Sequence, residues 1–378
     1  MRIRYGMVGG GEGAFIGAVH RMAARLDDSF ELVCGAFSSE AARALRSGAA
    51  LGLPAARVYS DYETMLAREA ALPTESRMQC VVIVTPNHLH LPVALGALAR
   101  GFHVLSDKPA TATLEQCRQL AAQLRGSGLH YGLTHPYSAY PMIREARARV
   151  ARGELGAVRK VLVEYTQGWL TEPIDQGGGN KQAAWRHDPA QSGVGGCMGD
   201  IGVHAFQLAE FVSGLSVTEL CADLRSVVAG RKLDDDGTVL MRFGPAASGT
   251  LIASQICAGD ENSLRLRVYG ERGGIDWQQM EPNSLWLRLL HGPAQLLRTG
   301  GAGTGAEAAT VQRVPAGHPE GYIEAFGTLY REFALLLQQG GTTSVPGIGA
   351  ALRGMAFVDT AVASSAAGCQ WRALPDHQ

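Results

Sequence analysis

The sequence has few charged residues for its length and no excess of either sign. Asp, Glu, Lys and Arg make up 18% of the 378 residues, and 34 basic residues stand against 35 acidic ones, for a formal charge of -1. A protein that binds nucleic acid or an anionic membrane surface usually carries a basic excess. We therefore expect neither partner.

Paired cysteines and long apolar runs are also missing. The seven cysteines are scattered and contain no C-x-x-C pair, so neither a disulfide framework nor a zinc site is indicated, and we expect no metal. No apolar run approaches the ~18 residues of a transmembrane helix. The first strand begins almost at Met1, without the apolar region of a signal peptide. We expect no membrane association and a reducing, cytoplasmic location.

Apolar residues are plentiful, at 46% of the 378 residues, and the length exceeds that of most single domains. About two domains are therefore expected. Over residues 1–135, short apolar runs alternate with helical patterns, which is typical of a doubly wound parallel sheet in an α/β fold. Asp61 and Thr113 stand where they would cap the helices that follow them. The strand-like runs are residues 4–8, 31–37, 58–62, 80–84, 103–105 and 130–135.

After residue 135 the hydrophobic period changes from 3.6 to 2. This predicts a second domain, residues 136–378, of the α+β type with a large, mostly antiparallel open sheet. A helix over residues 140–152 carries several arginines, most simply explained as a solvent-exposed face. A last helix near residues 350–367 is expected to pack at the domain junction. The strand-like runs are residues 158–165, 217–228, 238–243, 249–257 and 264–269.

The first strand is followed by a glycine-rich turn, Gly9–Gly17. Glycine lets the backbone approach a pyrophosphate without a Cβ in the way, and the next helix would offer N–H groups to the phosphates. Two alignments are open: Gly9-x-Gly11-x-x-Ala14 read literally, or a longer turn in which Gly17 is the third glycine. The candidate cofactor residues of the turn are Gly9, Gly11, Glu12, Gly13, Ala14, Phe15 and Ile16.

The residue that reads the cofactor ribose is expected about 20 residues beyond the turn, at the end of the second strand. There the chain has Ser38-Ser39-Glu40, with Arg43 a turn later. Serine with a nearby arginine would accept the 2′-phosphate of NADP, whereas Glu40 could bind the 2′-hydroxyl of NAD. NAD is slightly favoured and NADP stays open. Ser38 and Ser39 could also cap the helix expected from Glu40.

The most informative stretch follows the apolar run 80–84. It reads Thr85-Pro86-Asn87-His88-Leu89-His90-Leu91-Pro92 and continues through a helix and a short strand to Asp107-Lys108-Pro109. Ligands of a parallel sheet bind beyond the carboxyl ends of its strands, where both motifs stand. A lysine in that place is a candidate for chemistry. The residues placed on the cofactor side are Thr85, Pro86, Asn87, His90, Asp107 and Lys108.

In the second domain the sharpest feature is Gly199-Asp200-Ile201-Gly202-Val203-His204, at the start of a helix. Asp200 and His204 are four residues apart, so on a helix they share one face. Each also has an ordinary explanation: Asp200 favours the positive end of a helix, and His204 could be a buried structural histidine. One histidine and one aspartate are too few ligands for a metal ion.

Together these motifs resemble the Gfo/Idh/MocA family of NAD(P)-dependent oxidoreductases, which carries T-P-N-x-x-H-x-P followed by E-K-P. Here the last motif is Asp107-Lys108-Pro109, a conservative departure that keeps the lysine. The resemblance covers nearly the whole chain, and it implies that Lys108, Asp200 and His204 are catalytic partners. It also implies that subunits pair through the open sheet, as a homodimer or homotetramer.

Such a set suits the oxidation of a secondary alcohol, in which a hydride leaves carbon for NAD(P) while a base takes the hydroxyl proton. Histidine, with an ordinary pKa of about 6.5, suits the role of base, which falls to His204. Lys108 would stabilise charge that develops on the oxygen. Asp200 would orient the imidazole or a substrate hydroxyl.

The expected substrate is a sugar, anhydrosugar, glycoside or cyclitol, whose apolar faces stack on aromatic rings and whose hydroxyls need polar partners. The residues expected to contact it, besides Lys108, Asp200 and His204, are Tyr137, Trp169, Trp185, Arg186, His187 and His318. Two rival functions stay open: a redox-neutral, NAD-assisted glycosidase, and a nucleotide-binding regulator without catalysis.

Overall fold

The computed structural model describes residues 2–175 and 189–375. The chain forms two compact units, Met1–Thr134 with Phe326–Leu352, and His135–Ala325 with Arg353–Gln378. The division falls after Thr134 and again within two long helices, α11 (Tyr322–Gln339) and α12 (Ile348–Ala366). The first unit therefore also contains a segment from near the C-terminus.

The first unit is built on a parallel sheet of five strands in the order β2-β1-β3-β4-β5. One further parallel bridge joins Gly35 to Val58, in the predicted run 58–62. The doubly wound α/β fold predicted from the sequence is confirmed. The strands are β1 (Ile3–Gly9), β2 (Phe30–Ala36), β3 (Cys80–Val84), β4 (His103–Ser106) and β5 (Tyr131–Leu133).

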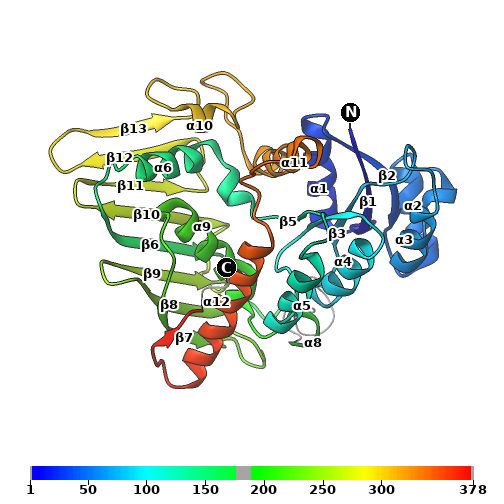
Figure 1. The fold of residues 1–378 in the computed structure, drawn as a ribbon. Coiled ribbons are helices and arrows are strands. Elements are labelled where there is room, and N and C mark those ends of the chain that lie inside the picture. Colours follow the sequence, from blue (N-terminus) through cyan, green and yellow to red (C-terminus); the bar gives the residue numbers. More distant parts are fainter. Residues whose placement is uncertain (1, 176–188, 376–378) are drawn as a thin grey trace. The chain divides into compact units, whose positions relative to one another are not determined.

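Helices connect these strands, and α3, α4 and α5 pack one against the next, as Figure 1 shows. Both predicted caps are present: Asp61 accepts a hydrogen bond from the N–H of Thr64 at 2.6 Å, and Thr113 from that of Gln116 at 3.2 Å. The helices are α1 (Phe15–Leu26), α2 (Ala41–Ala50), α3 (Tyr62–Ala70), α4 (His90–Leu98) and α5 (Leu114–Leu124).

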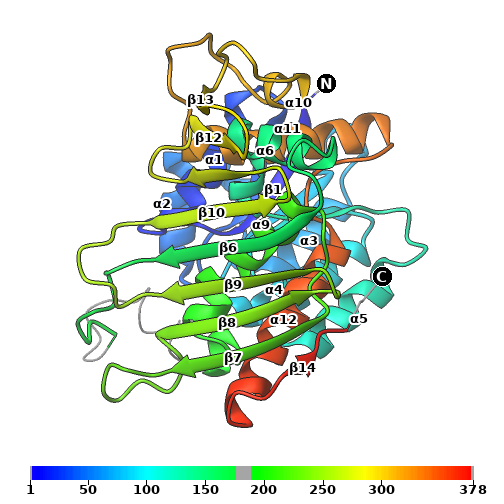
Figure 2. The same cartoon turned by 90° about the vertical axis from the view of Figure 1, so that its left-hand side faces the viewer.

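The second unit is built on a nine-stranded sheet in the order β13-β12-β11-β10-β6-β9-β8-β7-β14 (Figure 2). Neighbouring strands are antiparallel except β6 and β9, so the predicted mostly antiparallel sheet is confirmed. The strands are β6 (Val158–Thr166), β7 (Glu219–Arg225), β8 (Asp236–Phe243), β9 (Ala247–Ser254), β10 (Ser263–Gly270), β11 (Gly273–Gln278), β12 (Ser284–Leu289), β13 (Ala294–Arg298) and β14 (Arg372–Ala373).

Four strands of this sheet, β11 to β14, are absent from the predicted runs. In β11 the buried Asp276 interrupts the alternation of apolar residues that marks a strand. Its charge is compensated by ion pairs with Arg265 at 2.8 Å and Arg288 at 3.2 Å. In β13 only Leu297 is buried. Strands are recognised from their pattern of apolar residues, and that pattern is weak where a strand contains a buried ion pair or lies at the edge of the sheet.

Two helices cover one face of the second sheet. Of these, α6 (Pro141–Ala151) contacts β11 and β12, and α9 (Val203–Ser213) contacts β6, β9 and β10. The prediction that the arginines near α6 form a solvent-exposed face is wrong for Arg144 and Arg149, which are buried. Arg149 pairs with Glu145 at 2.7 Å and Glu154 at 2.8 Å, so its charge is compensated inside the unit and the side chain can be buried.

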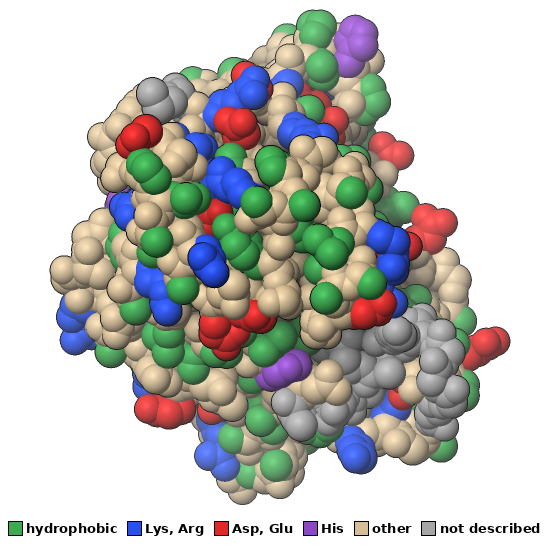
Figure 3. All heavy atoms as spheres, turned by 90° about the vertical axis from the view of Figure 1, so that its right-hand side faces the viewer, with side chains coloured by type: hydrophobic (Ala, Val, Ile, Leu, Met, Phe, Trp, Pro, Cys, Tyr) green, Lys and Arg blue, Asp and Glu red, His purple; other side chains and the backbone are tan. Residues whose placement is uncertain are grey.

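The surface mixes charged and apolar side chains. On the face shown in Figure 3, acidic and basic groups are interspersed among apolar ones. No helix within residues 2–175 and 189–375 combines the length and apolar content that a membrane crossing requires.

Candidate functional site

The glycine-rich turn joins β1 to α1, and close backbone contacts set its shape. Gly9 and Gly10 have φ values of +83° and +69°, which glycine adopts without strain. A Cβ on Gly17 would lie 2.3 Å from the Cα of Gly10, so only glycine fits there. Close packing of the helix on the turn is the role of the third glycine of the motif. The geometry therefore fits the longer alignment ending at Gly17 better than the literal one ending at Ala14.

The rest of the turn packs against α2 or faces outward. Phe15 and Ile16, placed in the turn by the sequence, are instead the first residues of α1, and Phe15 is 68% exposed. The N–H of Glu12 donates to Oγ of Ser47 at 3.0 Å. Gly13 has a φ of +81° and nothing within 4 Å of the place a Cβ would take, so this part of the turn is open.

The ribose candidates Ser38, Ser39 and Arg43 follow β2. Oγ of Ser38 accepts a hydrogen bond from the N–H of Glu40 at 3.1 Å, and Arg43 pairs with Glu40 at 3.6 Å. Neither serine caps α2, because that helix begins at Ala41 and Glu40 is its N-cap, without a side-chain cap bond. The guanidinium of Arg43 and the carboxylate of Glu40 thus lie together after β2, so this end of the strand offers a partner both for a 2′-phosphate and for a 2′-hydroxyl.

His90 joins the two motifs of the first unit. Its Nδ1 lies 2.7 Å from the carbonyl oxygen of Pro109, and its Nε2 lies 2.9 Å from that of Thr85. Burial lowers the pKa of His90, and the hydrogen bonds to these two carbonyl oxygens act in the opposite direction. The imidazole therefore connects the end of β3 to the end of β4.

Asp107 fixes the start of the motif that carries Lys108. Its Oδ1 accepts hydrogen bonds from the N–H of Lys108 at 2.8 Å and from Oγ1 of Thr134 at 3.0 Å. Lys108 is half-buried. Asn87 follows Pro86 and is buried in a short 3-10 turn, Asn87–Leu89.

These residues fit a dinucleotide. A Cβ on Gly9 would lie 2.7 Å from the carbonyl oxygen of Val84 and 3.1 Å from Cγ2 of Thr85, so the turn lies directly against the end of β3. Oγ1 of Thr85 is buried and has no hydrogen-bond partner among the described residues. A hydroxyl left unsatisfied beside the glycine turn fits a polar ligand. The turn and Thr85 would hold NAD, with Lys108 beyond the neighbouring strand.

In the second unit, Asp200 lies in a π-helical turn, Met198–Gly202, directly ahead of α9. Turns of this kind recur at functional sites. The carboxylate of Asp234 accepts hydrogen bonds from the N–H groups of Gly196 and Met198, both at 2.7 Å, and so fixes the entry to the turn. Burial raises the pKa of Asp234, although these donors favour its charged form.

The carboxylate of Asp200 lies at one end of a chain of hydrogen-bonded amide side chains. Nε2 of Gln255 donates to Oδ2 of Asp200 at 3.0 Å and to Oε1 of Gln167 at 3.2 Å. Gln167 in turn donates from Nε2 to Oδ1 of Asn262 at 2.7 Å. The indole N–H of Trp169 donates to Oε1 of Gln167 at 2.9 Å.

Two tyrosines extend this chain to His204. The hydroxyl of Tyr165 donates to Oδ1 of Asn262 at 2.7 Å, and the hydroxyls of Tyr137 and Tyr165 lie 2.5 Å apart. The Tyr137 ring meets the His204 ring edge to face, at 5.1 Å and 86°. Burial raises the pKa of both phenols, so both stay protonated at neutral pH. We call this set the polar network: Tyr137, Tyr165, Gln167, Trp169, Asp200, Gln255 and Asn262.

The polar network contains Asp200, Tyr137 and Trp169 from the predicted set, and His204 packs on Tyr137. His318 is exposed before α11, and its Nδ1 contacts the carbonyl oxygen of Pro315 at 3.2 Å. Within residues 2–175 and 189–375, no described hydrogen bond or ring contact links His318 to the polar network. The predicted residues Trp185, Arg186 and His187 lie outside the described residues.

Four members of the network were not found from the sequence: Tyr165, Gln167, Gln255 and Asn262. No motif marks them, because each is a single polar residue in or beside a strand: Tyr165 lies near the end of β6. Gln167 follows β6, Gln255 follows β9, and Asn262 precedes β10. Their position at the ends of predicted strands is the one signal by which they could have been singled out.

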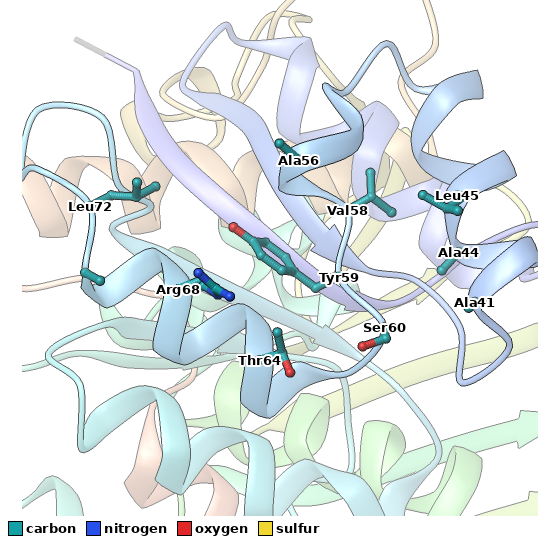
Figure 4. A pocket seen from close by; sticks show the side chains of 11 residues that line it. Ala41, Ala44, Leu45, Ala56, Val58, Tyr59, Ser60, Thr64, Arg68 and Leu72 are labelled. Carbon is teal, nitrogen blue, oxygen red and sulfur yellow. The ribbon is translucent and has the colours of Figure 1, made fainter.

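A separate hollow lies elsewhere in the first unit. A cavity of about 650 Å³ lies between α2, the segment Ala56–Ser60 and α3 (Figure 4). It includes none of the predicted site residues. Within residues 2–175 and 189–375, no group of three or more His, Cys, Asp or Glu side chains could hold a metal ion.

A doubly wound sheet with this glycine turn, joined to a large antiparallel sheet, is the architecture of a two-domain, nucleotide-dependent oxidoreductase. The chain belongs to the Gfo/Idh/MocA family. Residues 3–135 match its oxidoreductase family model, described as an NAD-binding Rossmann fold, and residues 143–276 match its C-terminal domain model. The predictions of the family and of an NAD-binding oxidoreductase are confirmed.

Similar proteins extend over the whole chain. An uncharacterized oxidoreductase of Bacillus subtilis, YfiI, is 31% identical over 98% of this chain and 96% of its own. The crystal structure of an oxidoreductase from Sinorhizobium meliloti is 46% identical, with a TM-score of 0.88 over 98% of this chain and 99% of that one. An inositol dehydrogenase homolog from Azotobacter vinelandii, complexed with NADH and myo-inositol, is 32% identical, with a TM-score of 0.93 over 99% and 98%.

Proposed function

We propose that this protein is a dehydrogenase that oxidises one ring hydroxyl of a sugar, anhydrosugar, glycoside or cyclitol to a ketone. The observation that carries the proposal is the polar network, which joins Asp200 to uncharged amide and hydroxyl groups next to His204. Neutral donors and acceptors suit the hydroxyls of a polyol, and the rings of Tyr137 and Trp169 suit its apolar faces. The myo-inositol complex of the Azotobacter vinelandii relative supports this substrate class.

Each residue has a proposed role. NAD, when bound, accepts the hydride that leaves the carbinol carbon. His204 takes the hydroxyl proton, and the ammonium of Lys108 stabilises the negative charge that develops on the oxygen. Asp200, held by Gln255, orients a substrate hydroxyl or the imidazole. The bonds balance: C–H and O–H break, C=O forms, and the hydride and proton leave to NAD and His204.

The first test is binding followed by turnover. The protein is titrated with NADH and with NADPH, and the preferred oxidised form is then offered with monosaccharides, anhydrosugars, glycosides and cyclitols, with reduced nicotinamide followed by its absorbance. We expect tight binding of NADH and turnover of at least one polyol. Glycoside cleavage without net formation of NADH would favour the redox-neutral glycosidase.

Variants sharpen this test. His204→Asn and Asp200→Asn should bind NADH as the wild type does and lose turnover, while the matched variant His291→Asn, on an exposed loop, should keep both. Binding of nucleotide without any turnover would favour the regulator. Failure to bind either nucleotide would contradict the proposal.

We also propose that subunits pair through the face of the second sheet that α6 and α9 leave open. In β8 and β12 alternate residues are buried, and Leu240, Trp286 and Leu296 are 44%, 39% and 44% exposed. Trp286 stands opposite Leu296 on the neighbouring strand. Light scattering should give a dimer or tetramer, and Trp286→Glu with Leu240→Glu should give a monomer. A wild-type monomer would contradict this assembly.

A further inference from the structure

His204 has a second imidazole within hydrogen-bond distance. Nδ1 of His204 lies 3.0 Å from Nδ1 of His135, and the rings meet edge to face at 4.9 Å and 84°. Both rings are buried, with His135 1% and His204 7% exposed. His135 stands outside every motif of the sequence and is the first residue of the second unit.

Hydrogen-bond chemistry limits what this pair can be. Two nitrogens at this distance share one proton, because two lone pairs or two N–H groups would repel each other. If Nδ1 of His204 carries the proton, Nε2 of His204 keeps its lone pair and is a base. If Nδ1 of His135 carries it, Nε2 of His204 carries its own proton and is an acid. The nitrogen that holds the shared proton therefore decides the role of His204.

We propose that His135 is a positioning residue for His204: its Nδ1 accepts the proton of His204 Nδ1 and so keeps Nε2 of His204 unprotonated, ready to take the proton of the substrate hydroxyl. This inference rests on the proposed role of His204. In the step, the substrate O–H bond breaks and an Nε2–H bond forms on His204. The resulting positive charge is shared with His135 through the Nδ1–H···Nδ1 bond.

At Nδ1 of His204 the partner is an imidazole, where the catalytic histidine of a Ser-His-Asp triad has a carboxylate. Among the titratable groups near His204, His135, Tyr137 and Tyr165 contact its ring, Tyr322 contacts Tyr137, and Asp200 lies one turn earlier on the π-helical turn. Oδ2 of Asp200 accepts a hydrogen bond from Nε2 of Gln255 at 3.0 Å. A neutral partner at Nδ1 stabilises an imidazolium less than a carboxylate does. The proton that His204 takes up is therefore held less tightly than it would be with a carboxylate at Nδ1.

The test uses NMR of the whole protein with ¹⁵N-labelled histidine, and His204→Asn assigns the signals of His204. At high pH, His204 of the wild type should show a protonated Nδ1 and an unprotonated Nε2. His135→Asn keeps an acceptor near Nδ1 and should keep this tautomer. His135→Phe keeps the volume without an acceptor and should lose it. His135→Asp places a carboxylate there and should raise the pKa of His204 by about one unit or more.

Turnover gives a second readout. The acid limb of the pH profile of kcat should move upward in His135→Asp by the same amount as the pKa measured by NMR, and His135→Asn should restore more of kcat than His135→Phe. A matched control is His130→Asn, in the first unit, whose ring stacks on His103 at 5.4 Å. That variant should leave the tautomer and the pKa of His204 unchanged.

Two results would overturn the inference. One is a wild-type His204 protonated at Nε2 and not at Nδ1 at high pH. The other is a pKa of His204 that stays the same in both His135→Asn and His135→Asp. The NMR measurements need no substrate, so they decide the role of His135 even in a protein that oxidised no polyol, and the two proposals can fail separately.

Discussion

The two units hold their candidate site residues in different ways. In the first, contacts between residues close in sequence fix the site: Gly17 packs on Gly10 with no room for a Cβ, and the carboxylate of Asp107 accepts a hydrogen bond from the N–H of the next residue, Lys108. In the second, side chains from distant parts of the sequence, such as Gln167, Gln255 and Asn262, hold one another.

This difference explains why the two halves of the site are marked differently in the sequence. A contact between residues close in sequence requires only a few consecutive residues, so it is visible as a compact motif. A side-chain network is met by residues that are neighbours only after folding. Single substitutions in each unit test this difference.

The largest effect is expected for Lys108→Met in the first unit. Loss of the ammonium should lower kcat/KM about 10³-fold, the size of effect seen on loss of a group that stabilises an oxyanion. Binding of NADH should change little, because the glycine turn is intact. The control Lys232→Met, at an exposed position of the second unit, should keep full activity in steady-state kinetics. Equal loss in both variants would remove Lys108 from the reaction.

Gly17→Ala tests the backbone contact itself. Its Cβ would lie 2.3 Å from Cα of Gly10, and since backbone cannot move aside freely, we expect a loss of about 1–3 kcal/mol in the free energy of unfolding. NADH binding should weaken at least about tenfold, or about 1.4 kcal/mol, by titration.

The control for this change is Gly349→Ala, because a Cβ there meets nothing within 4 Å. It should be neutral in stability and in NADH binding. If Gly17→Ala behaved like this control, the contrast between the two units would not hold.

His20 makes the first unit sensitive to acid. Burial lowers the pKa of His20 from 6.5 to about 4, and its Nδ1 contacts the hydroxyl of Tyr330 at 2.8 Å. The unfolded chain takes up the proton near pH 6.5, whereas the folded protein takes it up only near pH 4. The contribution of His20 to the free energy of unfolding is therefore fully present above pH 6.5. It is lost as the pH falls from 6.5 to about 4, by about 1.4 kcal/mol per pH unit.

Denaturant unfolding at several pH values measures this slope. His20→Gln should flatten it between pH 6.5 and 4, and the exposed control His291→Gln should leave it as in the wild type. A slope that is the same in both variants would show that other groups set the acid sensitivity.

The smallest effect is expected for Gln255→Ala in the polar network. It removes the hydrogen bonds to Asp200 at 3.0 Å and Gln167 at 3.2 Å, each contributing about 1 kcal/mol. The KM for the polyol should rise about tenfold with a smaller change in kcat, and NADH binding should stay as it is. Gln278→Ala, exposed on β11, is the control. A network that worked as one rigid unit would instead give a large loss of kcat.

Local signals made much of the fold predictable. All five residues of β3 are buried, so their sequence is an unbroken apolar run. Asp61 and Thr113 bond to the N–H groups three residues on, an interaction within one turn of chain. By contrast, burial of Arg149 depends on Glu145 and Glu154 and on the fold around them, and nothing in the spacing of the arginines on α6 indicates it.

The doubly wound sheet, the glycine turn and the family were predictable from the sequence, as was the shared helix face of Asp200 and His204. These follow from short-range constraints on backbone and hydrophobic period, which a few consecutive residues satisfy. Tertiary structure alone decided the neighbours of those residues: Gln255 at Asp200, His135 at His204, and Tyr137 against Tyr165. A hydrogen bond between side chains far apart in sequence depends on the distance between two strands or turns, which is fixed only when the whole unit has packed.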